Sequence, residues 1–558
     1  MTLPLHERAQ SADAAELVRL TTEAIGFASE SVFDLVAVAD AAGYLSLANP
    51  ELIPQRPLEA GEQYRFHFNM TKCIGCRSCE VACNEQNGNP AEIHWRRFGE
   101  IEGGTWPDTQ RSYLSMGCNH CLDAACLKGC PVNAYTKDPA TGIVLHSADA
   151  CIGCQYCVWN CPYSVPQFNP ERGVVGKCDM CHARLSDGLE PACVNACPES
   201  AIEIEIVNMA AWRENFAAAE SPGMPAAGHT ISTTRITLTK SAGKLEHVDL
   251  GHLQREHAHL SLVVMTILVQ TVSGALIYEL VKKSVSWASL TAELLITAIA
   301  LAVSAMHLGR PAYAWRALKM WRRSWISREV LLYTVFFGTL AALTTLSVVG
   351  TVRDARPEVV IGRLPVLQLL LSHEFLTGLG WISAITALAG TICSACIYLV
   401  PARPSWNLIH TPFDFLLTTA LLGSLIATPL HAMANRLAET AGMHGVSMSG
   451  TLATSAAQPA VAFAALWIFN QMVRWFRLRF SSMYERRASA TLLRTESLRA
   501  VLFASFALVG LAACFAIAGL GTLAGLSGLA GVFMSRYLFF VSVVPLNMAL
   551  TFVRGGRN

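Results

Sequence analysis

NMTKCIGCRSCEVAC, residues 69–83, is the most informative stretch of this chain, because Cys73, Cys76, Cys79 and Cys83 follow the spacing C-x2-C-x2-C-x3-C. The stretch CIGCQYCVWNCPY, which begins at residue 151, repeats this spacing. Three thiolates of one such loop reach three corners of an iron-sulfur cubane, and the cysteine after the three-residue gap ligates the second cluster of a pair. Both stretches therefore predict paired 4Fe-4S clusters.

Two more groups of four cysteines complete the set. MGCNHCLDAACLKGCP widens the middle gap to four residues, and KCDMCHARLSDGLEPACVNACP widens it to eleven. Sixteen of the nineteen cysteines thus form four groups, which are Cys73, Cys76, Cys79, Cys83; Cys118, Cys121, Cys126, Cys130; Cys151, Cys154, Cys157, Cys161; and Cys178, Cys181, Cys193, Cys197. The other three, Cys393, Cys396 and Cys514, lie in apolar runs and are interpreted as small buried hydrophobes.

Zinc and disulfides are the alternative readings of these cysteines. Zinc sites use two separated C-x2-C pairs, and a third cysteine only three residues later is not part of that pattern. Disulfides need an oxidising compartment, and residues 1–20 show no apolar export segment and no twin-arginine pair. Iron-sulfur clusters are the favoured interpretation.

The chain divides into two unlike halves. Its 558 residues are 52% hydrophobic and 15% charged, and nearly all cysteines lie before residue 200, whereas long apolar runs begin near residue 258. We expect an N-terminal extension (1–60), an α+β ferredoxin-like cluster domain (61–207), a linker (208–256) and an all-α polytopic membrane anchor (257–558). The linker is expected to be a tether, with an edge strand at 234–239 as a minor alternative. The net charge of +1 excludes a nucleic-acid partner.

Apolar windows long enough to cross a bilayer core of roughly 30 Å predict eight transmembrane helices. They run near 258–281, 288–308, 329–350, 375–399, 412–433, 452–475, 500–523 and 534–553. An even number places the cluster domain and the C-terminus on one face, together with the loops that carry most of the Lys and Arg. The positive-inside bias then predicts a bacterial inner membrane protein whose cluster domain faces the cytoplasm.

The cysteine-rich half resembles the four-cluster electron-transfer subunit of dimethyl sulfoxide reductase-type molybdoenzymes, through the four motifs quoted above. The resemblance implies four 4Fe-4S clusters and a separate molybdopterin catalytic subunit. The related nitrate reductase subunit carries tryptophan where this chain has Cys154 and holds a three-iron cluster there. The implied ligand sets are Cys73, Cys76, Cys79 with Cys197; Cys178, Cys181, Cys193 with Cys83; Cys118, Cys121, Cys126 with Cys161; and Cys151, Cys154, Cys157 with Cys130.

The apolar half resembles the membrane anchor subunit of the same family, through HLGRPAYAWRALKMWRRSWISREVL (307–331) and CSACIYLVPARPSWN (393–407). The resemblance implies membrane lipid and a quinone, with menaquinol as the expected donor in anaerobic respiration. His307 and Glu329 match the family's quinol-site residues, and Arg328, Ser327 and Trp325 are weaker candidates. Ordinary interface roles are the alternative, with Glu329 paired to Arg328 or Arg323 and His307 capping a helix. No haem is expected, because His307 and His431 lie at different depths.

The sequence thus predicts an electron-transfer and anchor subunit that lacks the catalytic centre for the terminal substrate. One alternative is the electron-transfer unit of a formate dehydrogenase or hydrogenase with a haem anchor. Another is a sulfite-oxidising, quinone-reducing complex, in which the same motifs would carry electrons in the opposite direction. An alternative of another class is a non-catalytic redox sensor or scaffold.

Overall fold

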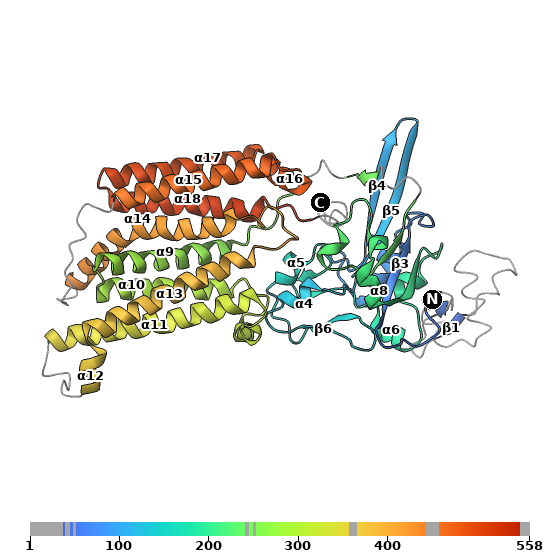
Figure 1. Cartoon of the computed structure of the whole chain (residues 1–558), viewed down its shortest axis with the longest axis horizontal. Helices are drawn as coiled ribbons and strands as arrows, with labels where there is room; N and C mark the ends of the chain where they lie inside the picture. Colours follow the sequence, from blue (N-terminus) through green and yellow to red (C-terminus); the bar gives the residue numbers. More distant parts are fainter. Residues whose placement is uncertain are drawn as a thin grey trace, which may run out of the picture.

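The structure is a computed structural model, and it describes residues 37–39, 45–47, 52–239, 245–248, 253–355, 365–440 and 457–546. A cluster domain lies at one end and a bundle of long, roughly parallel helices at the other (Figure 1). Most of the predicted N-terminal extension lies outside the described residues. Within it, β1 (Ala37–Ala39) pairs with β2 (Leu45–Leu47).

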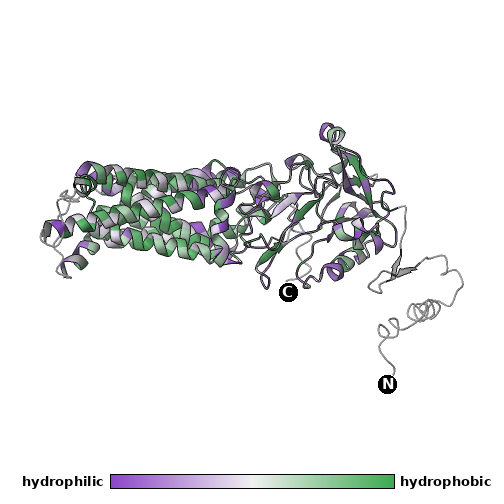
Figure 2. Cartoon of the chain, turned by 90° about the horizontal axis from the view of Figure 1, so that it is seen from below, coloured by the Kyte–Doolittle hydropathy of each residue, from purple (hydrophilic) through white to green (hydrophobic). Residues whose placement is uncertain are grey.

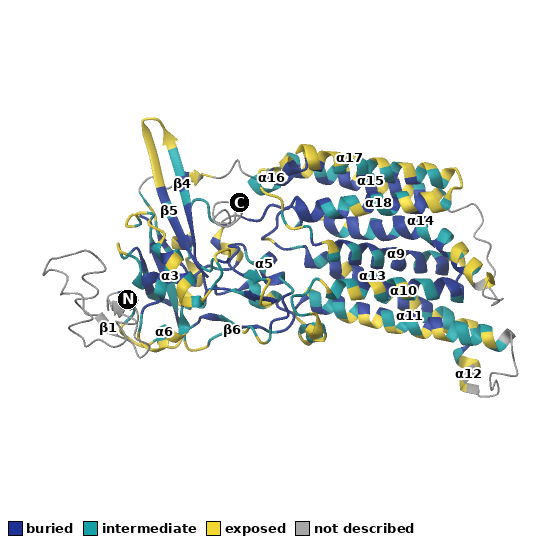
Figure 3. Ribbon diagram, turned by 180° about the vertical axis from the view of Figure 1, so that it is seen from behind, coloured by how far each residue is buried: buried dark blue, intermediate teal, exposed yellow. Residues whose placement is uncertain are grey.

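The cluster domain is built on two small three-stranded sheets. In the first, β3 (Glu62–Asn69) lies between antiparallel β10 (Ile202–Asn208) and parallel β11 (Arg235–Thr237). In the second, β4 (Arg97–Thr105) lies between β5 (Asp108–Met116) and β12 (Leu245–His247). The β4–β5 hairpin projects from the domain, and Trp106 at its tip is 87% exposed (Figure 3).

Short helices and two small hairpins follow the cysteine loops. The helices are α3 (Ser78–Asn87), α4 (Ala125–Gly129), α5 (Tyr156–Asn160), α6 (His182–Ser186) and α7 (Ala192–Asn195). The hairpins pair β6 (Tyr135–Lys137) with β7 (Val144–His146) and β8 (Gln167–Asn169) with β9 (Val174–Gly176). Alternation of loop and short helix lets one group of cysteines face two neighbouring sites.

The segment expected to be a tether instead packs on the cluster domain as far as Thr237. Helix α8 (Met209–Glu214) buries Trp212, whose indole nitrogen donates a 2.8 Å hydrogen bond to the carbonyl of Ser232. Beyond two 3-10 turns (Ala217–Ala219 and Ala227–His229), β11 extends the sheet of its own chain through β3. The alternating residues around 235 therefore supply an internal edge strand.

The second half is a bundle of helices that consist mainly of hydrophobic residues (Figure 2). Its long helices are α9 (Leu260–Lys282), α10 (Trp287–Ala305), α11 (Trp325–Ala355), α13 (His373–Ile397), α14 (His410–Thr440), α15 (Ala457–Arg479), α17 (Glu496–Ile517) and α18 (Gly521–Val541). The first seven overlap the first seven predicted windows. The eighth window, 534–553, was placed too late, because α18 begins at Gly521 and ends at Val541, and residues 547–553 lie outside the described residues. Shorter elements are the 3-10 helix η5 (Pro311–Met320), α12 (Pro365–Leu370) and α16 (Tyr484–Leu492).

Seven of these helices, rather than the predicted eight, are both long enough and apolar enough to cross a membrane within the described part of the chain. The exception is α15, which has the necessary length but carries Asn470, Gln471 and Arg474. These polar side chains are buried inside the bundle, and they lower the mean hydropathy of α15 without facing outward. The chain is a multi-pass membrane protein.

The two halves meet along a close backbone contact. Arg310, just after α10, donates its backbone N–H to the carbonyl of Ile152 at 3.1 Å, and Gly309 donates to Gly153 at 3.4 Å. A Cβ on Gly309 would lie 2.2 Å from the carbonyl oxygen of Gly173, so only glycine fits there. This contact fixes the third cysteine loop against the end of the bundle.

Candidate functional site

The cysteines gather into four sets in the folded chain. Cys73, Cys76, Cys79 and Cys197 line one small cavity, and Cys118, Cys121, Cys126 and Cys161 line another. Burial raises the pKa of Cys83, and the nearby thiols of Cys178, Cys193 and Cys181 raise it as well. Burial raises the pKa of Cys157, and the nearby thiols of Cys154, Cys151 and Cys130 raise it as well. These sets are the ligand sets that the family resemblance implies.

The four sets form a single row. Cys130 and Cys161 are exchanged between two neighbouring sets because α4 and α5 pack against each other. Burial raises the pKa of Cys178 to about 12, with the next largest contribution from the thiol of Cys118. The sets that contain these two cysteines are therefore neighbours. The pKa of Cys79 is raised to about 11, mainly by burial, and the thiol of Cys193 contributes to this rise. The row therefore begins at the Cys151 set and ends at the Cys73 set.

The loops suit iron-sulfur clusters. All sixteen cysteines are free thiols, and backbone N–H groups point at several sulfurs, including those of Cys197 at 3.2 Å, Cys130 at 3.3 Å and Cys151 at 3.4 Å. Hydrogen bonds of this kind stabilise the negative charge on ligating sulfur and tune cluster potentials. The 4Fe-4S clusters would supply one-electron transfer, and the thiol sets hold four sites for them.

One end of the row is at the surface and the other is against the bundle. Near the Cys73 set, Cys76 is exposed, Ile74 is 58% exposed and Val81 is 61% exposed. At the other end, Cys154 forms part of the wall of a cavity of about 240 Å³ between the cluster domain and α9, α10, α11 and α13. The row thus connects an open surface with a cavity at the end of the membrane helices.

His307 and Glu329 both line this cavity, together with Cys154. His307 follows α10, and its Nε2 lies 3.2 Å from the carbonyl oxygen of Cys154, so it contacts the cluster loop rather than capping its own helix. Burial lowers the pKa of His307, which favours the neutral imidazole. Glu329, the fifth residue of α11, is 8% exposed.

The arginines considered as partners of Glu329 bind elsewhere. Arg323 donates to the carbonyl of Leu127 and to the side chain of Asn133. Arg328 donates to the carbonyls of Trp321 and Arg322. Within the described ranges, Glu329 therefore forms no ion pair with either arginine, and its carboxyl group is left to the cavity.

The three weaker candidates lie outside the cavity wall. Arg328 packs over the ring of Trp325 at 4.3 Å, and Trp325 is 38% exposed. The hydroxyl of Ser327 is buried and donates to the carbonyl of Pro131 at 3.4 Å. Ser327 thus joins α11 to the cluster domain, and the other two lie at the bundle surface.

Other residues of the wall were not predicted. Trp159, Tyr333 and Tyr398 line the cavity, and the ring of Trp159 lies 6.1 Å from that of His307. His259, at the start of α9, contacts both rings at 5.2 and 5.4 Å. Burial and the neighbouring His307, His257 and Arg403 lower the pKa of His259 to about 3. Trp159 lies two residues after Cys157, and this closeness to a cysteine motif is the sign in the sequence that Trp159 belongs to the site.

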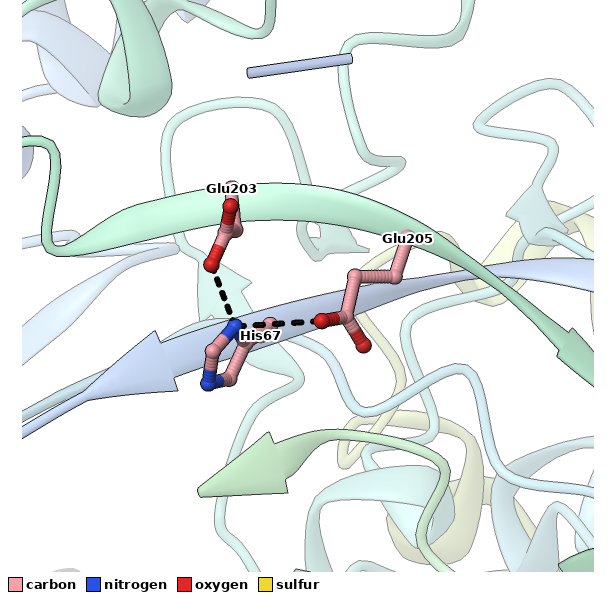
Figure 4. A group of neighbouring side chains, drawn as sticks. All are labelled: His67, Glu203 and Glu205. Carbon is pink, nitrogen blue, oxygen red and sulfur yellow. Dashed lines mark hydrogen bonds and ion pairs between the residues drawn. The ribbon is translucent and has the colours of Figure 1, made fainter. Parts of the chain in front are cut away.

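A second group of ligand-type side chains lies on the first sheet. His67 on β3 contacts Glu203 and Glu205 on β10 (Figure 4). Arg65 and Arg235 also bind Glu205, at 2.8 and 2.5 Å, and Thr237 binds His67 at 2.8 Å. These cations already compensate the carboxylate, so the group joins β3, β10 and β11 as an ion-pair network.

Comparison with known proteins covers both halves of the chain. A family model described as a 4Fe-4S dicluster domain matches residues 109–206, and one described as a DMSO reductase anchor subunit matches residues 254–540.

The B subunit of the anaerobic dimethyl sulfoxide reductase of Haemophilus influenzae is 40% identical over 151 residues, which are 25% of this chain and 73% of that protein. The corresponding B subunit of Escherichia coli is 38% identical over 168 residues, 29% of this chain and 82% of that protein. The formate dehydrogenase-O iron-sulfur subunit of Escherichia coli is 39% identical over 155 residues, 24% of this chain and 50% of that protein.

Proposed function

Because this chain belongs to the dimethyl sulfoxide reductase family, as its iron-sulfur and membrane anchor parts fused in one polypeptide, we propose that it passes electrons between a membrane quinone and a separate molybdopterin catalytic subunit. Menaquinol is the proposed donor. The terminal substrate is a property of the catalytic subunit. The chain supplies the quinone site, four 4Fe-4S clusters and the attachment to the membrane.

The observation that carries this proposal is the shared wall of the cavity. Cys154, from the first set of the row, lines the same space as His307 and Glu329. The space is mostly apolar and lies where the membrane helices end, so a quinone can reach it from the lipid phase. A carrier that binds there lies next to the first cluster, and electron transfer needs no further mobile component.

The cavity residues suit the chemistry of a quinol. Oxidation of a quinol releases two electrons and two protons, and the protons need acceptors. The neutral imidazole of His307 can bind a quinol hydroxyl, and the carboxylate of Glu329 can accept its proton. Trp159, Tyr333 and Tyr398 complete the apolar wall and keep bulk water out.

The exposed end of the row supports a docking place for the catalytic subunit. The Cys73 set lies close to the surface formed by Ile74 and Val81, and both side chains are apolar and exposed. Relatives that are named as the B subunit of dimethyl sulfoxide reductase imply such a partner. Electrons would leave the chain at this end.

The membrane arrangement proposed here has eight crossings, with α15 as the least apolar. Helix α15 packs against both α14 and α17, and its polar residues face the bundle interior, as expected for a polar helix shielded from lipid. With eight crossings, the basic α10–α11 connection, which contains η5, and the α15–α17 connection lie on the side of the cluster domain. The positive-inside bias then places that domain in the cytoplasm of a bacterium.

Replacement of Glu329 tests the quinone site. In Glu329→Gln, the side chain keeps its size but cannot accept a proton as a carboxylate, so we expect quinol-driven cluster reduction to slow by about tenfold to a thousandfold. Stopped-flow absorbance of the anaerobic full-length protein measures the rate. The iron content should equal that of the wild type.

A matched variant supplies the control. Glu374→Gln changes an exposed glutamate in the first turn of α13, at the opposite end of the bundle, and should leave the rate unchanged. If Glu329→Gln reduces its clusters at the wild-type rate, Glu329 has no part in the reaction. If quinol reduces neither variant nor the wild type, while dithionite reduces all three, the chain is better explained as a redox sensor.

A further inference from the structure

Two buried glutamates lie in the bundle, away from the cluster domain. Glu279 is near the end of α9 and Glu293 is in the second turn of α10, and both are 0% exposed. At a rise of 1.5 Å per residue, Glu293 lies about 9 Å from the start of its helix. Neither residue contributes to the quinone cavity or to the cysteine sets. A buried carboxyl group within membrane helices is energetically costly and calls for a functional explanation.

The two carboxyl groups form one cluster with little compensation. Ser289, which binds Glu279, lies four residues before Glu293 on the same face of α10, and α10 packs against α9, so both carboxyl groups lie in the contact between these two helices. Glu279 Oε2 accepts a 2.7 Å hydrogen bond from Ser289, whereas both oxygens of Glu293 have no hydrogen-bond partner among the described residues. His431 on α14 is the nearest basic group, with its Nδ1 4.0 Å from Glu279 Oε1 and likewise without a hydrogen-bond donor or acceptor.

Such a pair cannot hold two negative charges in an apolar bundle. Desolvation and mutual repulsion both favour a shared proton. A metal ion is a poorer occupant, because converging ligand atoms from three or more side chains occur, among the described residues, at His67, Glu203 and Glu205 and not here. The ligand that fits this cluster is therefore a proton.

A polar route leads from the pair to the end of the bundle opposite the cluster domain. Ser289 Oγ, which donates to Glu279, is 3.2 Å from Ser286 Oγ. Ser286 lines a second cavity of about 190 Å³, together with Arg353 and His373. Its lining residues come from the α9–α10 connection, the end of α11 and the start of α13, and these parts lie at the end of the bundle away from the cluster domain (Figure 1). Hydroxyl groups in series allow proton exchange with that cavity.

We propose that Glu279 and Glu293 form a proton-binding site that exchanges with the aqueous phase opposite the cluster domain through Ser289 and Ser286. The titratable groups that face it are His431 from α14 and, in the far cavity, Arg353 from α11 and His373 from α13. The site does not depend on whether a quinone occupies the first cavity. It gives the membrane domain a proton store of its own.

Infrared spectroscopy of the full chain in oriented vesicles tests the proposal. A protonated, buried carboxyl group gives a carbonyl band that shifts in heavy water. We expect this band in the wild type at neutral pH, and we expect its loss in Glu293→Gln and its persistence in the exposed control Glu374→Gln. The band should decline when the pH is raised on the far side, and Ser286→Ala should slow its exchange with heavy water.

Two results would overturn the site. One is a wild-type protein without a Glu293-dependent band at any pH in which it stays folded. The other is a band that follows the pH on the side of the cluster domain. Glu279→Gln keeps the test valid if Glu293→Gln fails to fold, because the proton should then reside on Glu293 alone and the frequency of its carbonyl band should shift. Iron content and helical circular dichroism check folding, and quinol oxidation is not part of the readout.

Discussion

Arg96 is a buried cation among the cysteine sets, and it shows how one residue can tune the row. It is 1% exposed and donates to the carbonyl and hydroxyl of Ser115, whose hydroxyl lies 3.1 Å from Cys79 Sγ. Although burial opposes it, the thiols of Cys193, Cys79, Cys178 and Cys83 raise the pKa of Arg96. A positive charge at this point stabilises the reduced, more negative clusters.

We therefore expect Arg96→Met to lower the reduction potential of the two neighbouring clusters by several tens of millivolts, on the order expected for unit charges several ångströms apart. Redox titration followed by electron paramagnetic resonance measures the shift. Arg56→Met removes an exposed arginine that binds Glu62 in the same domain, and its potentials should match the wild type. Equal potentials in both variants would show that Arg96 has only a packing role.

At the residue scale, the sequence predicts what spacing encodes and misses what only folding brings together. The spacing of the cysteines was sufficient to identify the sixteen that gather in the four sets. The motif around His307 and Glu329 identified two residues that share one cavity. His259 and Tyr398 lie about 50 and 90 residues from His307, and nothing local marks them. Arg328, a weaker candidate, adjoins Glu329 in the sequence but does not line the cavity, because adjacent residues of a helix point in different directions.

At the scale of elements, the junction between the α10–η5 turn and the third cysteine loop determines how the halves dock. Gly153 and Gly173 both have positive φ, at +70° and +65°, and Gly309 packs on both of them. A methyl group at position 309 has no room beside the carbonyl of Gly173. The two backbones would have to separate.

We expect Gly309→Ala to slow electron transfer from quinol to the clusters, since the cavity wall would lose its contact with Cys154. Cluster content and dithionite reduction should remain normal, because the cysteine sets lie within the other half. The control is Gly338→Ala on α11, where an added Cβ meets no atom within 4 Å. Wild-type kinetics in Gly309→Ala would mean that the halves do not need this contact.

The positions of the first seven long helices were predictable because apolar length is a local property, whereas the eighth window, 534–553, missed the start of α18 at Gly521. Hydropathy does not mark α15 as a membrane span, because its polar residues lower its mean hydropathy even though they face inward. The segment after residue 208 was misjudged for a different reason. Its few apolar residues, such as Trp212, gain a partner only when the first sheet has formed.

For the whole molecule, the proposed orientation has the cluster domain in the cytoplasm, and labelling from either side of the membrane tests it. Trp106, at the tip of the β4–β5 hairpin, and Val366, on α12, are exposed at opposite ends of the molecule. A cysteine introduced by Val366→Cys should react with a membrane-impermeant maleimide in spheroplasts. A cysteine introduced by Trp106→Cys should react only in inverted vesicles. Reaction of Trp106→Cys in intact spheroplasts would reverse the proposed orientation.

The central claim is that one polypeptide joins a quinone cavity to a row of iron-sulfur clusters. The most direct measurement is electron paramagnetic resonance of the anaerobically purified full chain, without any catalytic subunit, before and after addition of menaquinol. The account predicts about sixteen iron atoms per chain and signals of reduced 4Fe-4S clusters once quinol is added. Clusters that dithionite reduces but menaquinol leaves oxidised, or thiol sets filled with zinc, would contradict it.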